Sequence, residues 1–211
     1  MNENDLSYDI LKEIFNIGVG KAASMLSEIV GKKIILDIPN IIIVESEEQN
    51  KDIGKHFSAL PQGALMVSSI KFEEKITGEA NLLFPANKMR SFINLCIDQP
   101  EYMGCDDLNF TDMDFDIIRE VGNIILNSIV GELGNTFQVS LKYTLPEVKL
   151  FNADKFKRNL KSQEDLCILL LFISFIIEDV KIEGAVIINL TLDSLNELME
   201  MTKKMEDDLN G

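Results

Sequence analysis

Two polar side chains recur together, at the same spacing, in two distant parts of this 211-residue sequence. Glu13 precedes Asn16 by three residues, and Glu120 precedes Asn123 by three residues. A carboxylate accepts hydrogen bonds and pairs with cations, whereas a carboxamide offers an acceptor and a donor on one small group. Each Glu/Asn pair could therefore bind a charged, hydrogen-bonding partner.

Each Glu/Asn pair belongs to a longer pattern, with an aspartate before it and a proline after it. The pattern Asp-x3-Glu-x2-Asn-x22-Pro runs from Asp9 to Pro39, and it runs again from Asp116 to Pro146. With each residue type at about 5% usage, four fixed positions match by chance at roughly one starting position in 10⁵. Two matches in one chain are not a coincidence, and they predict an internal repeat.

The spacing places the polar residues of each copy on one face of a helix. Successive helical residues advance by about 100°, so the Asp, Glu and Asn of each copy fall within roughly 60° of arc. For one helix alone, a solvated outer face explains the polar stripe more simply. Asn is disfavoured inside helices, however, and the stripe recurs, so we interpret both Glu/Asn pairs as functional. The opposite, apolar stripes are Ile10, Leu11, Ile14 and Ile17, and Ile117, Ile118, Val121, Ile124 and Ile125.

Turn signals and hydrophobic periodicity predict the same order of elements in both halves. A polar cap precedes each motif helix, Asn4 or Asp5 in the first half and Thr111 with Asp114 in the second. A glycine suited to a C′ position follows each helix, Gly31 in the first half and Gly134 in the second. In the first half there follow a strand at 33–38, a strand pair at 64–72 and 78–84, and a closing helix at 87–96. In the second half the strand is at 138–145, the strand pair at 166–177 and 180–190, and the closing helix at 193–205.

This order predicts an α+β fold made of two pseudosymmetric halves. Neither half covers its own sheet, so we expect one domain over 1–211 with shared sheet structure. The repeats, at about 1–97 and 110–206, are joined by a loop at 98–109, and 45–54 forms a second, charged loop.

The composition narrows the choice of partners and location. Asp and Glu number 35 against 20 Lys and Arg, a net charge of −15, whereas nucleic acids and anionic membranes attract clustered basic residues. The 12 residues at 166–177 are too few for a transmembrane helix, which needs about 20. The acidic N-terminus is not a signal peptide, and the three cysteines, Cys96, Cys105 and Cys167, do not form a disulfide framework. We predict a cytoplasmic protein with no nucleic-acid or membrane partner.

Other catalytic arrangements lack their central residues. His56 is the single histidine, so neither a Ser-His-Asp site nor a metal-ligand cluster is expected. Gly18 and Gly20 do not follow a strand, so they do not form a phosphate-binding loop, and close helix packing explains them better. We expect no cofactor in the chain itself.

The segment from Glu13 to Glu28, EIFNIGVGKAASMLSE, resembles the first helix of the CheC family of chemotaxis phosphatases, whose related groups include CheX and FliY. The resemblance covers nearly the whole chain, because both motif copies and the elements between them follow the family order. It implies two halves that share a sheet and expose both motif helices to a partner. CheX-like proteins usually retain one motif and FliY-like proteins carry a further domain, so two motifs and the short tail after Met205 favour the stand-alone CheC type.

The resemblance also implies an activity. The substrate is the aspartyl phosphate of a CheY-like chemotaxis response regulator, whose own Mg²⁺ and lysine stabilise the phosphoryl charge. Asn16 or Asn123 orients the attacking water. Glu13 or Glu120 pairs with the lysine of the regulator. An enzyme of this kind is a protein phosphatase that needs no nucleophile, base or metal of its own.

Several roles stay open. Asp9 and Asp116 are structural or lie at the rim of the site, in preference to direct catalysis, and Pro39 and Pro146 shape the chain. The bulky Phe15 stands beside Asn16 where the second copy has a glycine, so docking could differ between the copies. The alternative function is that of a regulatory partner of the receptor deamidase CheD, with little catalysis.

Overall fold

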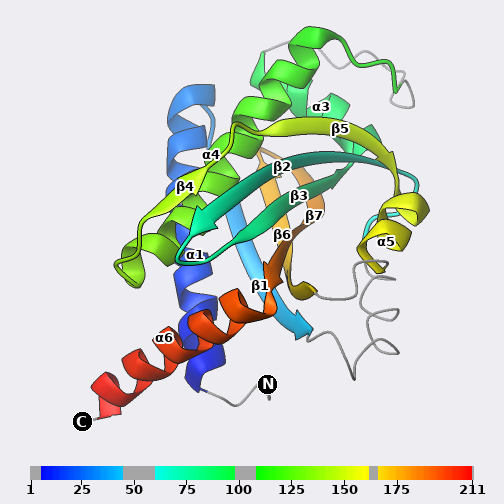
Figure 1. The fold of residues 1–211 in the computed structure, drawn as a ribbon. Coiled ribbons are helices and arrows are strands. Elements are labelled where there is room, and N and C mark those ends of the chain that lie inside the picture. Colours follow the sequence, from blue (N-terminus) through cyan, green and yellow to red (C-terminus); the bar gives the residue numbers. More distant parts are fainter. Residues whose placement is uncertain (1–5, 45–59, 98–107, 162–165, 211) are drawn as a thin grey trace.

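The structure is a computed structural model that describes residues 6–44, 60–97, 108–161 and 166–210 (Figure 1). Its helices are α1 (Leu6–Val30), α3 (Ala86–Cys96), α4 (Asp112–Thr136), α5 (Ala153–Lys161) and α6 (Leu192–Asn210). Its strands are β1 (Ile34–Val44), β2 (Ala64–Glu74), β3 (Gly78–Pro85), β4 (Leu141–Tyr143), β5 (Glu147–Asn152), β6 (Leu166–Ile177) and β7 (Val180–Thr191). The predicted cap at Asn4 or Asp5, the loop at 45–54, most of the loop at 98–109, His56 and Cys105 lie outside these residues.

The strands of the two halves interleave in one antiparallel sheet. Their order is β1-β6-β7-β3-β2-β4, and β5 also pairs with β2. The first strand of each half therefore pairs with a strand of the other half, β1 with β6 and β4 and β5 with β2. This shared sheet confirms the predicted α+β fold of two pseudosymmetric halves. The boundaries of the two repeats stay a prediction.

The halves meet along the central pair β3 and β7, and a glycine lies on each side of that junction. Gly78 stands opposite Leu190, and a Cβ atom there would lie 2.5 Å from the backbone oxygen of Asn189. A Cβ atom at Gly184 would meet the backbone oxygen of Leu83 even more closely. Both positions need glycine because another backbone approaches them.

The motif prolines lie on the two edges of the sheet. The prediction that the first strand ends at Pro39 is wrong, because β1 continues to Val44 with a register shift between Asp37 and Asn40. Pro146 lies between β4 and β5, at the corresponding place on the opposite edge. An edge strand has a hydrogen-bonding partner on one side only, so a proline there can lack its N–H donor without breaking the sheet. A bulge accommodates one extra residue in a strand, so pairing can continue beyond it.

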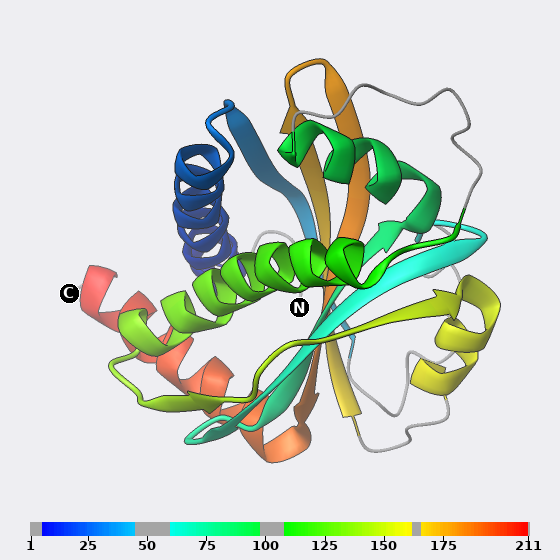
Figure 2. The ribbon, with the colours of Figure 1, turned by 90° about the horizontal axis from the view of Figure 1, so that it is seen from above.

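Helices cover the two faces of the sheet unequally (Figures 1 and 2). The larger core lies between one face and helices α1, α3, α4 and α6, and it contains Phe15, Phe72, Phe92 and Phe175. The smaller core lies on the other face beneath α5, which contributes Phe156 and Leu160. Alternate residues of each strand serve the two cores, as the two-residue period of a strand requires.

Several local predictions hold and others fail. Gly31 ends α1 with φ +71°, and Thr111 with Asp114 forms a capping box on α4, both as predicted. Gly134, however, lies inside α4, where a Cβ atom would be 3.0 Å from the oxygen of Val139. The elements β5 and α5 were not predicted, because β5 is a largely exposed edge strand and α5 is short and rich in charge.

The two motif helices pack directly against each other and run in clearly different directions (Figure 2). A Cβ atom on Gly18 of α1 would lie 2.9 Å from both Cα of Ile129 and the oxygen of Ser128 on α4. Backbone atoms cannot swing aside, so this crossing requires the absence of a side chain at Gly18. Gly20, two residues further on, faces open space, because a Cβ atom there would have no neighbour within 4 Å.

Alanine at these two glycines is expected to have opposite effects. Gly18→Ala should lower the free energy of unfolding by about 1–3 kcal/mol, because the helices must move apart. Gly20→Ala should raise it by about 0.5–1 kcal/mol, because alanine is the better helix former and the position is open. Urea unfolding midpoints, compared at equal m-values, measure both changes. Shifts of the two variants in the same direction would contradict the crossing.

Candidate functional site

The first motif lies on the solvent side of α1. Asp9 and Glu13 are exposed and Asn16 is half-buried. Glu13 forms no ion pair, and Asn16 no side-chain hydrogen bond, with the described part of the chain. Both groups are therefore available to a partner.

Contacts near its N-terminus hold α1 in place. The Tyr8 hydroxyl donates to the oxygen of Ile41 at 2.8 Å, and it accepts from the amide of the same residue at 3.3 Å. The hydroxyl is also 3.1 Å from Oδ1 of Asn40. These bonds join α1 to β1 just beyond the register shift at Pro39. The motif proline lies in the stretch of β1 where the register shifts, directly before the residues that contact Tyr8.

The second motif lies on α4 in a similar way, but its side chains have partners. Asp116 and Glu120 are exposed and Asn123 is half-buried. Asp116 forms an ion pair with Arg119. Nδ2 of Asn127 donates to Oδ1 of Asn123 at 2.6 Å. Glu120 forms no ion pair within the described ranges.

The beginning of α4 is fixed by a charged cluster. Arg90 of α3 contacts Oδ2 of Asp114 at 2.8 Å and lies 4.7 Å from the centre of the Phe110 ring. The amide of Thr111 donates to the same carboxylate oxygen at 2.7 Å. Burial by itself raises the pKa of Asp114, but the bonds from Thr111 and Arg90 outweigh it and hold the pKa below its usual value.

The two Glu/Asn pairs lie on separate parts of one helical layer. The helices cross where Gly18 meets Ser128 and Ile129. After the crossing along both helices, Lys21 of α1 forms an ion pair with the buried Glu132 of α4. Each motif precedes the crossing along its own helix. Because the helices run in different directions, the motifs extend away from the crossing on different sides (Figures 1 and 2).

The surroundings of the two asparagines differ. Ile17, predicted to lie on the buried stripe, is 41% exposed, whereas Ile124 at the matching place in α4 is 6% exposed. Ile17 stands on the Glu13 side of the helix, about 40° from it, so it faces solvent with the motif.

Phe15 and its counterpart Gly122 differ in how they pack. Phe15 is fully buried, so it does not itself form part of the exposed surface, and the expectation that docking differs between the two copies stays a prediction. Gly122 lies against β2, where a Cβ atom would be 2.6 Å from Cβ of Ser68. The difference between these residues therefore concerns how each helix packs on the sheet.

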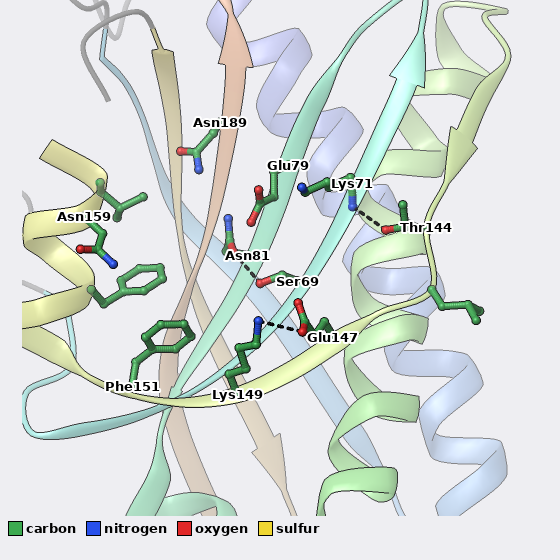
Figure 3. A pocket seen from close by; sticks show the side chains of 13 residues that line it. Ser69, Lys71, Glu79, Asn81, Thr144, Glu147, Lys149, Phe151, Asn159 and Asn189 are labelled. Carbon is green, nitrogen blue, oxygen red and sulfur yellow. Dashed lines mark hydrogen bonds and ion pairs between the residues drawn. The ribbon is translucent and has the colours of Figure 1, made fainter. Parts of the chain in front are cut away.

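A groove of about 460 Å³ lies on the other face of the sheet (Figure 3). Its floor carries a hydrogen bond of 2.6 Å between Ser69 and Asn81, and its rim an ion pair of 2.7 Å between Lys149 and Glu147. Ser69 alternates with Ser68, which faces α4, so the groove and the motif helices lie on opposite faces. The groove is not part of the candidate site.

Metal ligation and membrane insertion find no support in the described residues. No three His, Cys, Asp or Glu side chains there lie close enough to hold a metal ion. No helix in the same ranges is long and apolar enough to cross a membrane. The expectation that the chain carries no cofactor of its own stays a prediction.

The sequence is similar to a known protein family and to a characterised protein. Residues 6–43, which contain the first motif and all of β1 except Val44, match the model of the CheC-like family. The chain is 27% identical over 142 residues to the CheY-P phosphatase CheC of Bacillus subtilis (strain 168), covering 67% of this chain and 65% of that protein. The match thus spans just under two thirds of that relative.

Solved structures share the fold. FliY of Thermotoga maritima matches with a TM-score of 0.72 and 18% identity, over 97% of this chain and 99% of that chain. A chain of the FliG–FliM complex from H. pylori matches with a TM-score of 0.65 and 10% identity, over 95% of this chain and 100% of that chain. Together, the comparisons confirm the resemblance of this protein to the CheC-like family and show that it shares its fold with FliY.

Removal of the Asp114 charge is expected to destabilise the protein in a pH-dependent way. Asp114→Asn should lower the free energy of unfolding by about 1.5–3 kcal/mol at pH 7, because a charge-assisted bond to Arg90 is lost. The folded pKa of Asp114 lies below its ordinary 3.8, so the deficit should be complete above that pH and disappear as pH falls through the lower folded value. Asp112→Asn, in the same helical turn but exposed, is the control. Equal effects of the two variants in urea unfolding at pH 7 would contradict this role.

Proposed function

We propose that this protein hydrolyses the aspartyl phosphate of a CheY-like chemotaxis response regulator. The observation that carries the proposal is the presentation of two Glu/Asn pairs on the solvent side of adjacent helices. The likeness to a CheY-P phosphatase supports the choice of substrate. The fold alone would not decide it, because FliM structures also share this fold.

The proposed chemistry divides the work between the two proteins. An acyl phosphate reacts with an in-line water, and the regulator supplies Mg²⁺ and a lysine to stabilise charge on the phosphoryl oxygens. Orientation of the water is what a docking partner can add, and positioning of this kind lowers the barrier substantially. This division suits a chain whose two motifs offer only carboxylates and carboxamides.

Each residue of a pair has a distinct part. The carbonyl oxygen of Asn16 or Asn123 accepts a hydrogen bond from the attacking water and aligns it with the phosphorus–oxygen bond that breaks. Glu13 or Glu120, one turn earlier, pairs with the regulator's lysine and fixes the register of docking. Asp9 and Asp116 lie another turn away, at the rim. When the water's oxygen bonds to phosphorus, the bond to the aspartate oxygen breaks and the aspartate carboxylate stays on the regulator. One proton of the water remains on the released phosphate and the other passes to solvent, so no group of this chain is consumed.

The cellular setting follows from the proposed substrate. A chemotaxis response regulator is a cytoplasmic protein, and the proposal therefore includes a cytoplasmic location. Association with a CheD-like deamidase stays a prediction, because no contact of the described residues bears on it.

Substitution of the two asparagines tests the proposal. A regulator is phosphorylated with a small phosphodonor, and the decay of the phosphorylated form is followed with and without this protein. Asn16→Ala with Asn123→Ala should lower the added decay rate by about 100-fold, whereas each single change should leave part of it, because either helix works alone.

Asn135→Ala provides the matched control, because Asn135 is an exposed asparagine of α4 outside the motif. It should retain full activity. No acceleration by the unaltered protein, or full activity in the double variant, would refute the assignment.

Ionic strength provides a second test. The chain carries a net charge of −15, and the phosphorylation site of a receiver is itself acidic, so long-range repulsion should slow association. Moderate salt screens this repulsion. The second-order rate of dephosphorylation should therefore rise between low and moderate salt at constant Mg²⁺. A clear fall would show instead that attraction between charged patches guides docking.

A further inference from the structure

The two Glu/Asn pairs differ at the position one helical turn after the asparagine. In α4 this position is Asn127, and in α1 it is Gly20. Residues four apart lie on the same helical face, so each of these positions adjoins the carboxamide of its motif. The difference therefore lies beside the proposed catalytic group.

At the second motif the neighbouring side chain holds the carboxamide. Nδ2 of Asn127 donates to Oδ1 of Asn123 at 2.6 Å. At the first motif, Asn16 has no side-chain hydrogen bond to the described chain, and the space around Gly20 is empty within 4 Å. One carboxamide thus has a side-chain hydrogen bond before a partner arrives, and the other has none within the described residues.

Asn127 is itself held in an unfavourable way. Its Oδ1 is buried and has no hydrogen-bond partner within the described residues. A buried carbonyl without a partner destabilises a protein, and an unpaired group of this kind in a native fold calls for a reason. Orientation of a functional side chain provides one.

We propose that Asn127 is a positioning residue that orients Asn123 for catalysis, so that the two sites work unequally. The inference rests on the proposed phosphatase function. A carbonyl oxygen has two lone pairs, so Oδ1 of Asn123 accepts from Asn127 with one and keeps the other for the water. The second site loses no ordering entropy at the carboxamide when the regulator docks, whereas Asn16 must be ordered in each encounter.

Single-site proteins separate the two contributions. In the Asn16→Ala background only the second site works, and there Asn127→Ala and Asn127→Leu should each lower kcat about two- to tenfold, the factor expected for ordering one side chain, with KM unchanged. In the Asn123→Ala background the same substitutions should lose their effect. Gly20→Asn in that background should raise kcat of the first site, because it supplies the missing donor.

Stability measurements separate positioning from a structural role. Asn127→Leu keeps the approximate shape and removes the buried unpaired carbonyl, so its melting temperature should be equal to or higher than that of the unaltered protein while kcat falls. NMR of the free protein gives a readout that needs no activity: the Asn123 side-chain amide should be more rigid than that of Asn16, and Asn127→Leu should remove the difference.

These experiments distinguish failure of the positioning role from failure of the proposed phosphatase function. If the unaltered protein does not accelerate decay, the phosphatase function fails while NMR still tests the contact. If the enzyme is active but Asn127→Leu leaves kcat of the second site unchanged or raises it, the positioning role is overturned. A change in KM alone would also overturn it, because Asn127 would then contribute to docking.

Discussion

The structure depends on the pairing of β3 with β7, because this central pair joins the strand pair of one half, β2 and β3, to the strand pair of the other, β6 and β7. Gly78 and Gly184 make that junction possible, since a side chain at either would strike the backbone of the opposite strand. β1 pairs with β6 at one edge of the sheet, and β4 and β5 pair with β2 at the other. Neither half could form this sheet alone, so the surface that carries the two motifs is a product of both.

The two motif helices occupy corresponding places on one face of this sheet. Helices α1 and α4 lie on the same face and cross at Gly18, and each is anchored separately near its N-terminus. Tyr8 ties α1 to β1, and Arg90 ties α4 to α3 through Asp114. The anchors lie close before each motif and the crossing lies after it. Each Glu/Asn pair is therefore held on a fixed stretch of helix, with an exposed glutamate and a half-buried asparagine on the solvent side.

Much of this arrangement could be predicted from the sequence because its signals are local. The doubled motif, the helix stop at Gly31, the capping box at Thr111 and the paired apolar strands all follow from spacing and residue type. Strand order could not be predicted, because β1 pairs with β6 across more than a hundred residues of chain. Pro39 was misjudged because proline is tolerated at a sheet edge, and which strand lies at an edge is a long-range property.

At the site, the sequence predicted the exposed residues better than their neighbours. Periodicity places Ile17 on the buried stripe, because it does not reveal which part of that stripe a neighbouring helix covers. The contact of Asn127 with Asn123 does have a signal in the sequence, because the repeat places asparagine in one copy where the other has Gly20. A difference between two otherwise matched repeats was thus more informative than either copy alone.

The most direct measurement is a structure of this protein bound to a response regulator loaded with beryllofluoride and Mg²⁺. The account predicts that the regulator docks on α1 or α4, with the Asn16 or Asn123 carboxamide within hydrogen-bonding distance of the in-line water or fluoride. It also predicts the Glu of the same pair on the regulator's lysine. A regulator seated instead in the groove around Asn81, with both motif faces open to solvent, would contradict it.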